Sequence, residues 1–287
     1  MKTIKYILIG LFMFHLYGYA GEKRALIVAI ALYPEHSGWK PINADNDATI
    51  LLNTLKKKGF SERNITVLRD SMATKQQITA AFQSLEEVAE SGDFVFIHFS
   101  THGQQMEDDD GDEPDGLDEA IVCYDAQMFY SPEYEGENHL RDDEIDVLLL
   151  PIRKKLGETG NVIVSLDACH SESTTRGEEG EEVVRGTAVV FSPNPGYIRK
   201  NTDGISKPPL IQERGLAPIT ELAASESNKP NYEYKEGYGS LTYALCAVWD
   251  KYDILPEYDV WSEEIKQKMN EILQRPVQTP VFRTTLK

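Results

Sequence analysis

NVIVSLDACHS, residues 161–171, is an apolar run that ends at Cys169. A second apolar run, DFVFIHFSTHG at residues 93–103, ends at His102. Short apolar runs with polar ends are typical of strands that are buried in a parallel sheet. Open sheets of this kind bind their ligands outside the carboxyl ends of the strands. We therefore expect Cys169 and His102 to meet at one rim of a parallel sheet as a thiol–imidazole pair.

The surrounding sequence alternates predicted strands with predicted helices. Before the His102 strand the order is strand, helix, strand, helix, and this βαβαβ pattern implies parallel strands joined by right-handed crossovers. We predict an α/β fold with a mostly parallel central sheet. The predicted strands are residues 25–33, 64–69, 120–124, 187–191 and 219–225, and the predicted helices are residues 44–58, 74–88, 142–156, 241–249 and 260–273.

The N-terminus has the three parts of a secretory signal peptide. Two lysines form a charged start, residues 6–17 are apolar, and small residues precede a cut after Ala20. The apolar run is shorter than the roughly 20 residues of a membrane-spanning helix, which favours cleavage over an uncleaved anchor. We expect residues 1–20 to be a signal peptide, residues 21–287 to form one domain, and the mature chain to be periplasmic or extracellular.

The mature chain is strongly acidic. The full sequence has a formal net charge of −18, and removal of the two signal-peptide lysines brings it to −20. This sign disfavours nucleic acid and anionic lipid as partners and suits cationic substrates or divalent cations. We expect no nucleic-acid partner and no membrane partner after the signal peptide is removed.

An odd number of cysteines leaves at least one thiol outside any disulfide. The three are Cys123, Cys169 and Cys246, and a Cys123–Cys246 bridge with one spare thiol is the simplest interpretation for an exported chain. The sequence has no C-x-x-C pair, which disfavours a zinc site or a thioredoxin-like site.

A thiol beside an imidazole suits nucleophilic catalysis on acyl groups. The imidazole helps to form the thiolate and then returns a proton to the departing amine. The negative oxygen of the tetrahedral intermediate needs fixed donors, and the backbone amides of Gly103 and Cys169 are the candidates. These residues predict a cysteine peptidase with Cys169 as nucleophile and His102 as base. The alternative for His102 is a buried core histidine.

Two aspartates are candidates for the walls of a substrate pocket. Asp167 lies two residues before Cys169, on the same side of the strand. Because a carboxylate does not help a neighbouring thiolate, Asp167 makes more sense facing a cationic substrate side chain. Asp47, near the start of the first predicted helix, is a second candidate wall. Its alternative role is a charge that the helix dipole favours, and composition alone does not decide between the two.

Two charged loops flank these strand ends. Residues 173–186 follow the cysteine strand, and their charge and glycine content are typical either of a solvated surface loop or of a processing loop cut at Arg176 or Arg185. The acidic residues 108–118 suggest calcium, but their glycines do not match the EF-hand spacing. A solvated acidic loop is therefore favoured for that segment.

Taken together, the motifs resemble those of the metacaspases, a branch of the caspase-like cysteine peptidases. They stand in the family's order across nearly all of the mature chain. The His-Gly strand end and the D-A-C-H-S segment are the specific pieces, and the others add modest weight. The matching segments are residues 25–30, 46–48, 99–103, 115–120, 140–144, 167–171, 222–225 and 239–244.

The resemblance implies a fold, a catalytic dyad and a specificity. The fold is a caspase-like three-layer α/β/α sandwich, and the dyad is His102 with Cys169. Cleavage is implied after Arg or Lys, with Asp47 and Asp167 matching the family's acidic S1 pocket. Many metacaspases also process themselves.

The resemblance also raises the question of calcium, which activates many metacaspases. The family's calcium-binding acids fall on Asp118, Asp142 and Asp143. Arg176 stands where a fourth acid is expected. We therefore expect that the chemistry requires no cofactor, with calcium as an option tied to the three aspartates.

Three functional hypotheses follow. The first is a monomeric cysteine endopeptidase, made as a zymogen, that cleaves peptides or proteins after Arg or Lys and processes itself at Arg176 or Arg185. The second is a non-catalytic binding or scaffold domain on the same fold, because fold does not fix function. The third is an Arg-specific peptidase of the clostripain or gingipain type, although D-A-C-H-S and Asp47 favour the metacaspase side.

Overall fold

A computed structural model describes residues 21–108, 111, 113, 116–169, 183–194, 197, 210–226, 229–234, 237–254, 256–273 and 278–286. The predicted signal peptide lies outside the described residues, as does most of the predicted processing loop. No helix in the described ranges is both long and apolar enough to span a membrane.

A six-stranded sheet forms the centre of the molecule, in the order β11-β8-β7-β3-β1-β2. Its neighbouring strands are parallel except for the edge pair β11 and β8, which confirms the prediction of a mostly parallel sheet. Every residue of β3 is buried, as expected for a strand covered on both faces. The strands are β1 (Lys23–Ala29), β2 (Ile65–Arg69), β3 (Phe94–Ser100), β7 (Asn161–Asp167), β8 (Ile219–Ala223) and β11 (Val281–Thr284).

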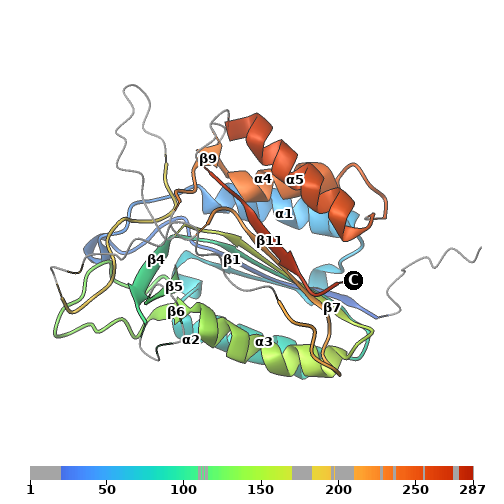
Figure 1. Cartoon of the computed structure of the whole chain (residues 1–287), viewed down its shortest axis with the longest axis horizontal. Coiled ribbons are helices and arrows are strands. Elements are labelled where there is room, and N and C mark those ends of the chain that lie inside the picture. Colours follow the sequence, from blue (N-terminus) through green and yellow to red (C-terminus); the bar gives the residue numbers. More distant parts are fainter. Residues whose placement is uncertain are drawn as a thin grey trace, which may run out of the picture.

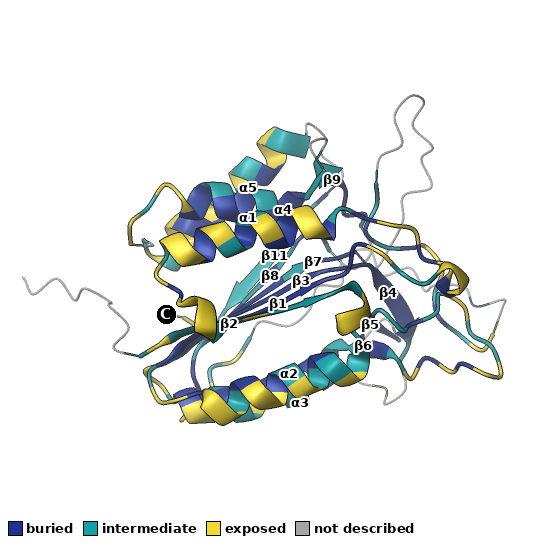
Figure 2. Ribbon diagram, turned by 180° about the vertical axis from the view of Figure 1, so that it is seen from behind, coloured by how far each residue is buried: buried dark blue, intermediate teal, exposed yellow. Residues whose placement is uncertain are grey.

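Helices cover both faces of this sheet and give the molecule three layers (Figures 1 and 2). One face carries α1 (Ala44–Lys57), α4 (Ser240–Trp249) and α5 (Tyr258–Leu273), and the other carries α2 (Lys75–Val88) and α3 (Asp142–Leu156). Each face has its own apolar core. Alternate residues of β1 serve the two cores, Ile27 the first and Val28 the second, because side chains alternate across a strand.

Local signals explain where two of the helices begin and continue. Thr74 caps α2, and its hydroxyl oxygen accepts a hydrogen bond from the Gln77 amide at 3.3 Å. Pro151 lies inside α3 without ending it. The carbonyl that this proline leaves without a helical donor belongs to Val147, whose side chain is exposed. That turn therefore faces water, which can satisfy the carbonyl.

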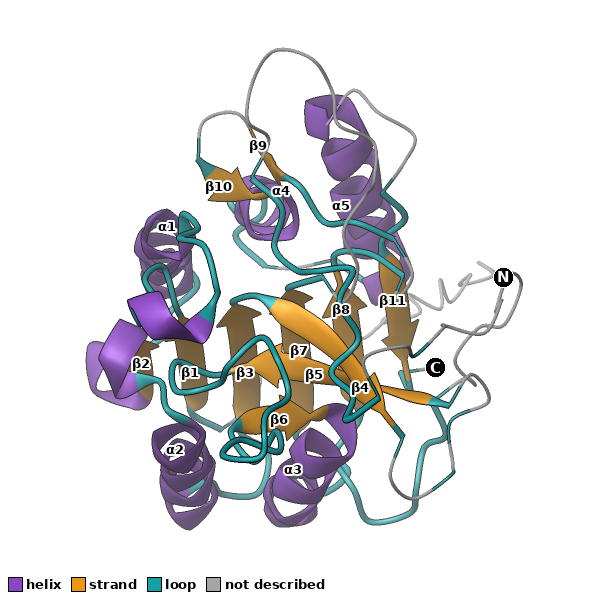
Figure 3. Cartoon of the chain, turned by 90° about the vertical axis from the view of Figure 1, so that its left-hand side faces the viewer, coloured by secondary structure: helices purple, strands orange, loops and turns teal. Residues whose placement is uncertain are grey.

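Two smaller sheets lie apart from the central one. β4 (Gly103–Glu107), β5 (Leu117–Val122) and β6 (His139–Arg141) form an antiparallel sheet that starts where β3 ends (Figure 3), and β9 (Glu233–Tyr234) pairs with β10 (Tyr238–Gly239). The predicted strand at residues 120–124 belongs to the β4-β5-β6 sheet.

The predicted strand at residues 187–191 was wrong. The backbone pairing of this segment and the residue before it with β4 consists of two isolated bridges, Gly103 with Gly186 and Met106 with Phe191. The side chain of Gln104 also donates to the Val189 carbonyl at 3.0 Å. Between the bridges, the Val189 amide donates to the hydroxyl of Thr187 at 3.2 Å. Such a local side-chain bond competes with a strand ladder for backbone groups.

Candidate active site

The ends of β3 and β7 meet around the backbone of Arg185. The two strands are neighbours, and their last residues pair in register. His102 follows β3, and Cys169 follows β7. The amides of Gly103 and Cys169 both donate to the carbonyl oxygen of Arg185, over distances of 3.2 and 2.8 Å. The structure thus brings the two predicted strand ends and both predicted oxyanion donors to one carbonyl group.

His102 is a buried imidazole with a defined tautomer. Its Nε2 lies 2.8 Å from the carbonyl oxygen of Lys40, and since a carbonyl only accepts, Nε2 carries the proton. Nδ1 is then the basic nitrogen, and it is buried with no hydrogen-bond partner in the described part of the chain. The ring stacks on Trp39, with centroids 5.0 Å apart.

The surroundings of His102 keep its ring neutral at neutral pH. Burial lowers the pKa of His102 to about 4, the bond to Lys40 opposes this shift, and the charge of Arg185 adds to it. A neutral ring with an unprotonated Nδ1 can accept a proton. His102 therefore has the protonation state that a general base needs.

Cys169 is a buried thiol whose Sγ donates to the carbonyl oxygen of Lys229 at 2.9 Å. None of the three cysteines, all of which are described, forms a disulfide, so the expected Cys123–Cys246 bridge was wrong. Burial raises the pKa of both of those thiols well above the ordinary value. Cys169 is buried too, but it follows β7 at the strand end that meets the His102 end of β3, and this position makes it the candidate nucleophile.

The peptide bond between Arg185 and Gly186 passes directly against Cys169. A Cβ atom on Gly186 would lie 2.1 Å from the Cys169 carbonyl oxygen and 3.1 Å from its Cβ. Only glycine lets two backbones approach this closely. Arg185, with its carbonyl oxygen on two amides and its next residue against Cys169, has the backbone position of a residue whose peptide bond is to be cut.

The residues before Arg185 lie as an extended segment beside β9. The Arg185 amide donates to the Asn231 carbonyl at 3.1 Å, and the Glu233 amide donates to the Val183 carbonyl at 3.0 Å. An antiparallel bridge lies between these two bonds. Peptides commonly bind to proteins by adding a strand to an edge in this way, so residues 183–185 have the conformation of a bound peptide.

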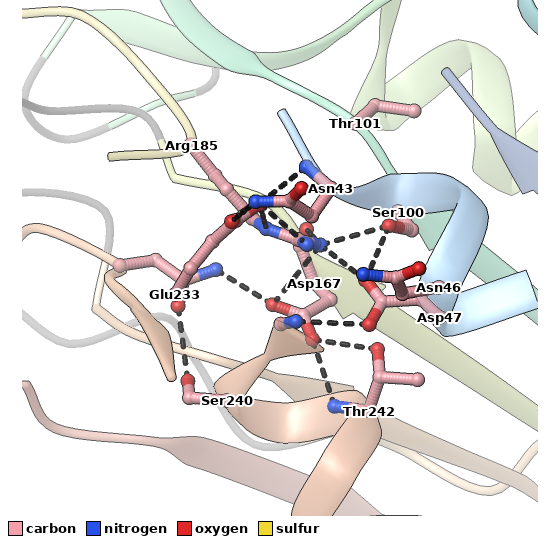
Figure 4. A network of polar contacts seen from close by, with 12 residues as sticks. Asn43, Asn46, Asp47, Ser100, Thr101, Asp167, Arg185, Glu233, Ser240 and Thr242 are labelled. Atoms are coloured by element: carbon pink, nitrogen blue, oxygen red, sulfur yellow. Dashed lines mark hydrogen bonds and ion pairs between the residues drawn. The ribbon is translucent and has the colours of Figure 1, made fainter. Parts of the chain in front are cut away.

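The Arg185 side chain fills a pocket lined by three carboxylates, Asp47, Asp167 and Glu233, which we call the acid pocket (Figure 4). Its Nη1 lies 2.7 Å from an Asp47 oxygen and 3.8 Å from an Asp167 oxygen, and its Nη2 lies 2.9 Å from a Glu233 oxygen. The arginine and both aspartates are fully buried. A buried charge is tolerated only with partners, and the acid pocket supplies them for a cation.

Hydrogen bonds distinguish the two aspartates of the acid pocket. Asp167 accepts from the amide and the hydroxyl of Thr242 and from the side chain of Asn231. Asp47 accepts from the Ser100 hydroxyl and the Gly239 amide. Burial acts to raise the pKa of Asp167, but Arg185 and the hydrogen bonds outweigh it and hold that pKa below the ordinary value. Burial raises the pKa of Asp47 to about 6, with Arg185 opposing the shift and Asp167 adding to it.

Gly239, in the predicted motif at residues 239–244, forms one wall of the acid pocket. A Cβ atom on this residue would lie 2.2 Å from an Asp167 oxygen and 2.6 Å from Nη1 of Arg185. A larger residue here would take the space of the guanidinium. The glycine is therefore part of what makes room for a basic side chain.

The three predicted calcium acids do not form one ligand group in the described part of the chain. Asp118 is buried and pairs with the arginine that ends β6, and Asp143 lines a surface cavity of about 630 Å³. Asp142 lies instead with Glu113 and Glu119, and one oxygen of each falls within 4.8 Å of the others. We call these three residues the acid cluster. Carboxylate oxygens are ligands that suit Ca²⁺, and of the three predicted aspartates the acid cluster contains Asp142.

Several site features escaped the sequence analysis. Glu233 stands in no motif, and the roles of the Lys40 and Lys229 carbonyls carry no side-chain signal. The alternative of a solvated surface loop was wrong at Arg185, which is fully buried. Arg176, the other predicted processing site, lies outside the described residues.

A thiol and an imidazole at adjacent strand ends, beneath a filled acid pocket, belong to the caspase-like class of α/β sandwich. The caspase domain is the family of this chain, since the sequence profile of that family matches residues 22–287. The chain is similar to metacaspase III c of Phaeodactylum tricornutum, at 31% identity over 158 residues, which cover 53% of this chain and 43% of that protein. It is also similar to metacaspase-1B of Aspergillus clavatus, at 30% identity over 213 residues, which cover 71% and 44%. The chain thus spans less than half the length of these relatives.

The same architecture occurs in a protein of Geobacter sulfurreducens known from a crystal structure. The two chains superpose with a TM-score of 0.63 at 24% sequence identity, over 92% of this chain and 93% of the other. This likeness concerns the fold. Together with the family match and the three layers, it confirms the predicted caspase-like α/β/α sandwich.

Proposed function

We propose that the chain is a cysteine endopeptidase that cleaves peptides or proteins after Arg or Lys, with Cys169 as nucleophile and His102 as base. One observation carries the proposal: Arg185 of the same chain lies in the site as a substrate residue would. Its side chain is in the acid pocket, its carbonyl oxygen is on two amides, and the next residue touches Cys169. The caspase-domain match and the metacaspase relatives support the same class of reaction.

The proposed reaction begins when the Cys169 thiol gives its proton to Nδ1 of His102. The thiolate attacks the carbonyl carbon of the basic residue, and the oxygen that becomes negative accepts from the amides of Gly103 and Cys169. Nε2–H of the charged ring stays bonded to the Lys40 carbonyl. Nδ1 then protonates the departing amine as the C–N bond breaks. Water, deprotonated by the same histidine, hydrolyses the thioester and releases the new carboxylate and the thiol.

Self-processing is part of the proposal. The bond in register with Cys169 is that between Arg185 and Gly186, and we propose it as the processing site in preference to Arg176. Because Arg185 fills the acid pocket, the intact chain excludes the basic side chain of any other substrate. The intact chain is then a zymogen, which opens to other substrates once residues 183–185 leave.

Two further properties belong to the proposal without a role in the chemistry. Calcium would act through the acid cluster as a modulator, and no step of the reaction uses it. Export rests on residues 1–20 alone. N-terminal sequencing of the exported chain tests it, with Gly21 expected as the first residue.

The test is hydrolysis of fluorogenic peptides by the mature chain, with Arg, Lys or Asp before the cut bond, with and without calcium. We expect turnover of the Arg and Lys peptides, and a cut after Arg185 in the chain's own mass spectrum. Cys169→Ala should reduce both by at least about 10³-fold, because it removes the nucleophile. Cys246→Ala, which removes a buried thiol that the reaction does not use, is the matched control and should stay active.

Three outcomes would count against the proposal. Full activity of Cys169→Ala would show that Cys169 and His102 do not act as the catalytic dyad. Turnover of the Asp peptide alone would refute the acid pocket as the S1 site. A chain that stays whole and inactive with or without calcium would favour the non-catalytic binding domain.

A further inference from the structure

Glu233 and Asp47 hold different edges of the Arg185 guanidinium. One oxygen of Glu233 accepts from Nε at 3.2 Å and from Nη2 at 2.9 Å. One oxygen of Asp47 lies 2.7 Å from the third nitrogen, Nη1. The carboxylates of the acid pocket therefore contact all three nitrogens of the planar guanidinium, Glu233 on one edge and Asp47 on another. Only a guanidinium presents donors in that plane.

A lysine in the same place would lose the Glu233 side of this arrangement. Counted outward from the backbone, lysine has a methylene where arginine has Nε, and its ammonium stands where arginine has Cζ. The ammonium can approach Asp47 as a point charge, but Glu233 would then face a methylene. The Glu233 side chain is only 3% exposed, so water would not replace the lost donor. A buried acceptor left short of donors is unfavourable.

Glu233 is fixed in a way that prevents it from following a shorter side chain. Its carboxylate accepts from both the backbone amide and the side-chain amide of Asn43, the residue that precedes α1. Its own backbone lies in β9, which pairs with β10, and bonds to Val183. The carboxylate is thus held at the distance that suits Nε and Nη2.

We propose that Glu233 selects arginine over lysine at the residue before the cut bond. The inference rests on the proposed function and narrows its substrates to arginyl peptides. Asp47 and Asp167 supply negative charge for any basic side chain. Glu233 adds an acceptor for Nε and Nη2 of arginine, and a lysine side chain has no donors at those positions.

The first experiment measures self-processing at residue 185 in four full-length mature chains. These are the natural chain, Arg185→Lys, Glu233→Gln and the double variant. Arg185→Lys should slow the cut about 10- to 100-fold in the natural background, which is the effect of one or two lost charge-assisted hydrogen bonds. In the Glu233→Gln background the same exchange should change the rate less than about 3-fold, because the two positions are coupled.

Two more variants complete the design. Glu233→Asp keeps the charge but shortens the reach, so its arginine-to-lysine ratio should fall between the other two. Glu257→Gln, an exposed residue directly before α5, makes the same chemical change outside the acid pocket and should leave the ratio unchanged. Thermal unfolding of each variant checks that it is folded.

A second arm uses the processed protein and two fluorogenic peptides that differ only in Arg or Lys before the cut bond. Equal rates for the two peptides would overturn the role of Glu233. So would a ratio that survives Glu233→Gln, or survives Glu233→Asp if the glutamine variant does not fold. Failure of the natural chain to cut itself or either peptide would count against the proposed function instead, so the two failures are distinguishable.

Discussion

The acid pocket and the acid cluster both gather three carboxylates, but they stand in different relations to the positive charges around them. The acid pocket surrounds Arg185, a residue of another segment that enters with its backbone bonded to the catalytic strand ends. Beside the acid cluster, Arg141 forms an ion pair with Asp118, and the two residues lie on the adjacent strands β6 and β5. Arg185 thus enters its pocket from another segment of the chain, whereas Arg141 connects strands of the sheet to which it belongs.

This difference explains why acidic residues alone do not identify a substrate site. In the acid pocket, the arginine is held at two places at once, its guanidinium by carboxylates and its carbonyl oxygen by two amides. Beside the acid cluster, Arg141 of β6 bonds to Asp118 on the neighbouring strand β5 and to the carbonyl of Glu107 on β4, so its bonds stay within one small sheet. The combination of side-chain and backbone capture beside a thiol is what indicates a peptide substrate.

The largest expected effect is a difference between Arg185 and Arg141 in how much their replacement lowers the free energy of unfolding. In the Cys169→Ala background, which keeps the chain whole, Arg185→Gln should lower the free energy of unfolding by about 3–5 kcal/mol, because it leaves buried carboxylates without their cation. Arg141→Gln should cost less, about 1–3 kcal/mol, since that side chain is 20% exposed whereas Arg185 is fully buried. Denaturant unfolding measures both. Equal losses would mean that the two arginines play equivalent structural roles.

The next effect tests whether the basic side chain needs the space that Gly239 leaves in the acid pocket. Gly239→Ala places a methyl group 2.2 Å from an Asp167 oxygen and 2.6 Å from the guanidinium. We expect self-processing and turnover of arginyl peptides to fall roughly 100-fold, because the basic side chain is displaced from its aligned position.

A matched glycine supplies the control for that variant. Gly215→Ala introduces the strain of a left-handed backbone, but nothing lies within 4 Å of its new methyl group. It should keep its activity. If Gly239→Ala also stays active, the basic side chain is not bound where Arg185 lies.

The centre of the sheet could be predicted because β1, β3 and β7 are short apolar runs, whereas the edge strand β11 was not predicted. The same pattern placed His102 and Cys169 at neighbouring strand ends, where the structure has them. The strand predicted at residues 187–191 failed because a hydrogen bond from the Val189 amide to Thr187 competes with the ladder, and hydropathy does not report such a bond.

The side of the site formed by β9 could not be predicted from the sequence. Glu233 faces Asn43 only because the fold brings β9 beside the start of α1. A lone glutamate in a polar stretch carries no spacing signal that would reveal this. Asp142 likewise joins Glu113 and Glu119 because β5 and α3 meet, whereas the resemblance grouped it with Asp118 and Asp143.

The smallest expected effect is on the pH dependence of self-processing, which distinguishes Asp47 from His102. With Arg185 in place, burial raises the pKa of Asp47 to about 6 and lowers that of His102 to about 4. The guanidinium favours the ionised form of Asp47, so protonation of Asp47 must weaken the hold on Arg185. The rate of self-processing should therefore fall about 3- to 10-fold as the pH drops through about 6, while His102 is still neutral.

Asp47→Asn is the variant that assigns this dependence. Its asparagine does not titrate, so its self-processing should be slower at neutral pH but should stay level down to about pH 4, where His102 takes up a proton. The measurement is the self-processing rate from pH 4 to 8 in both chains. A fall near pH 6 that persists in Asp47→Asn would assign the titration to another group. It would also leave Asp47 as a structural partner of Arg185 whose charge the reaction does not need.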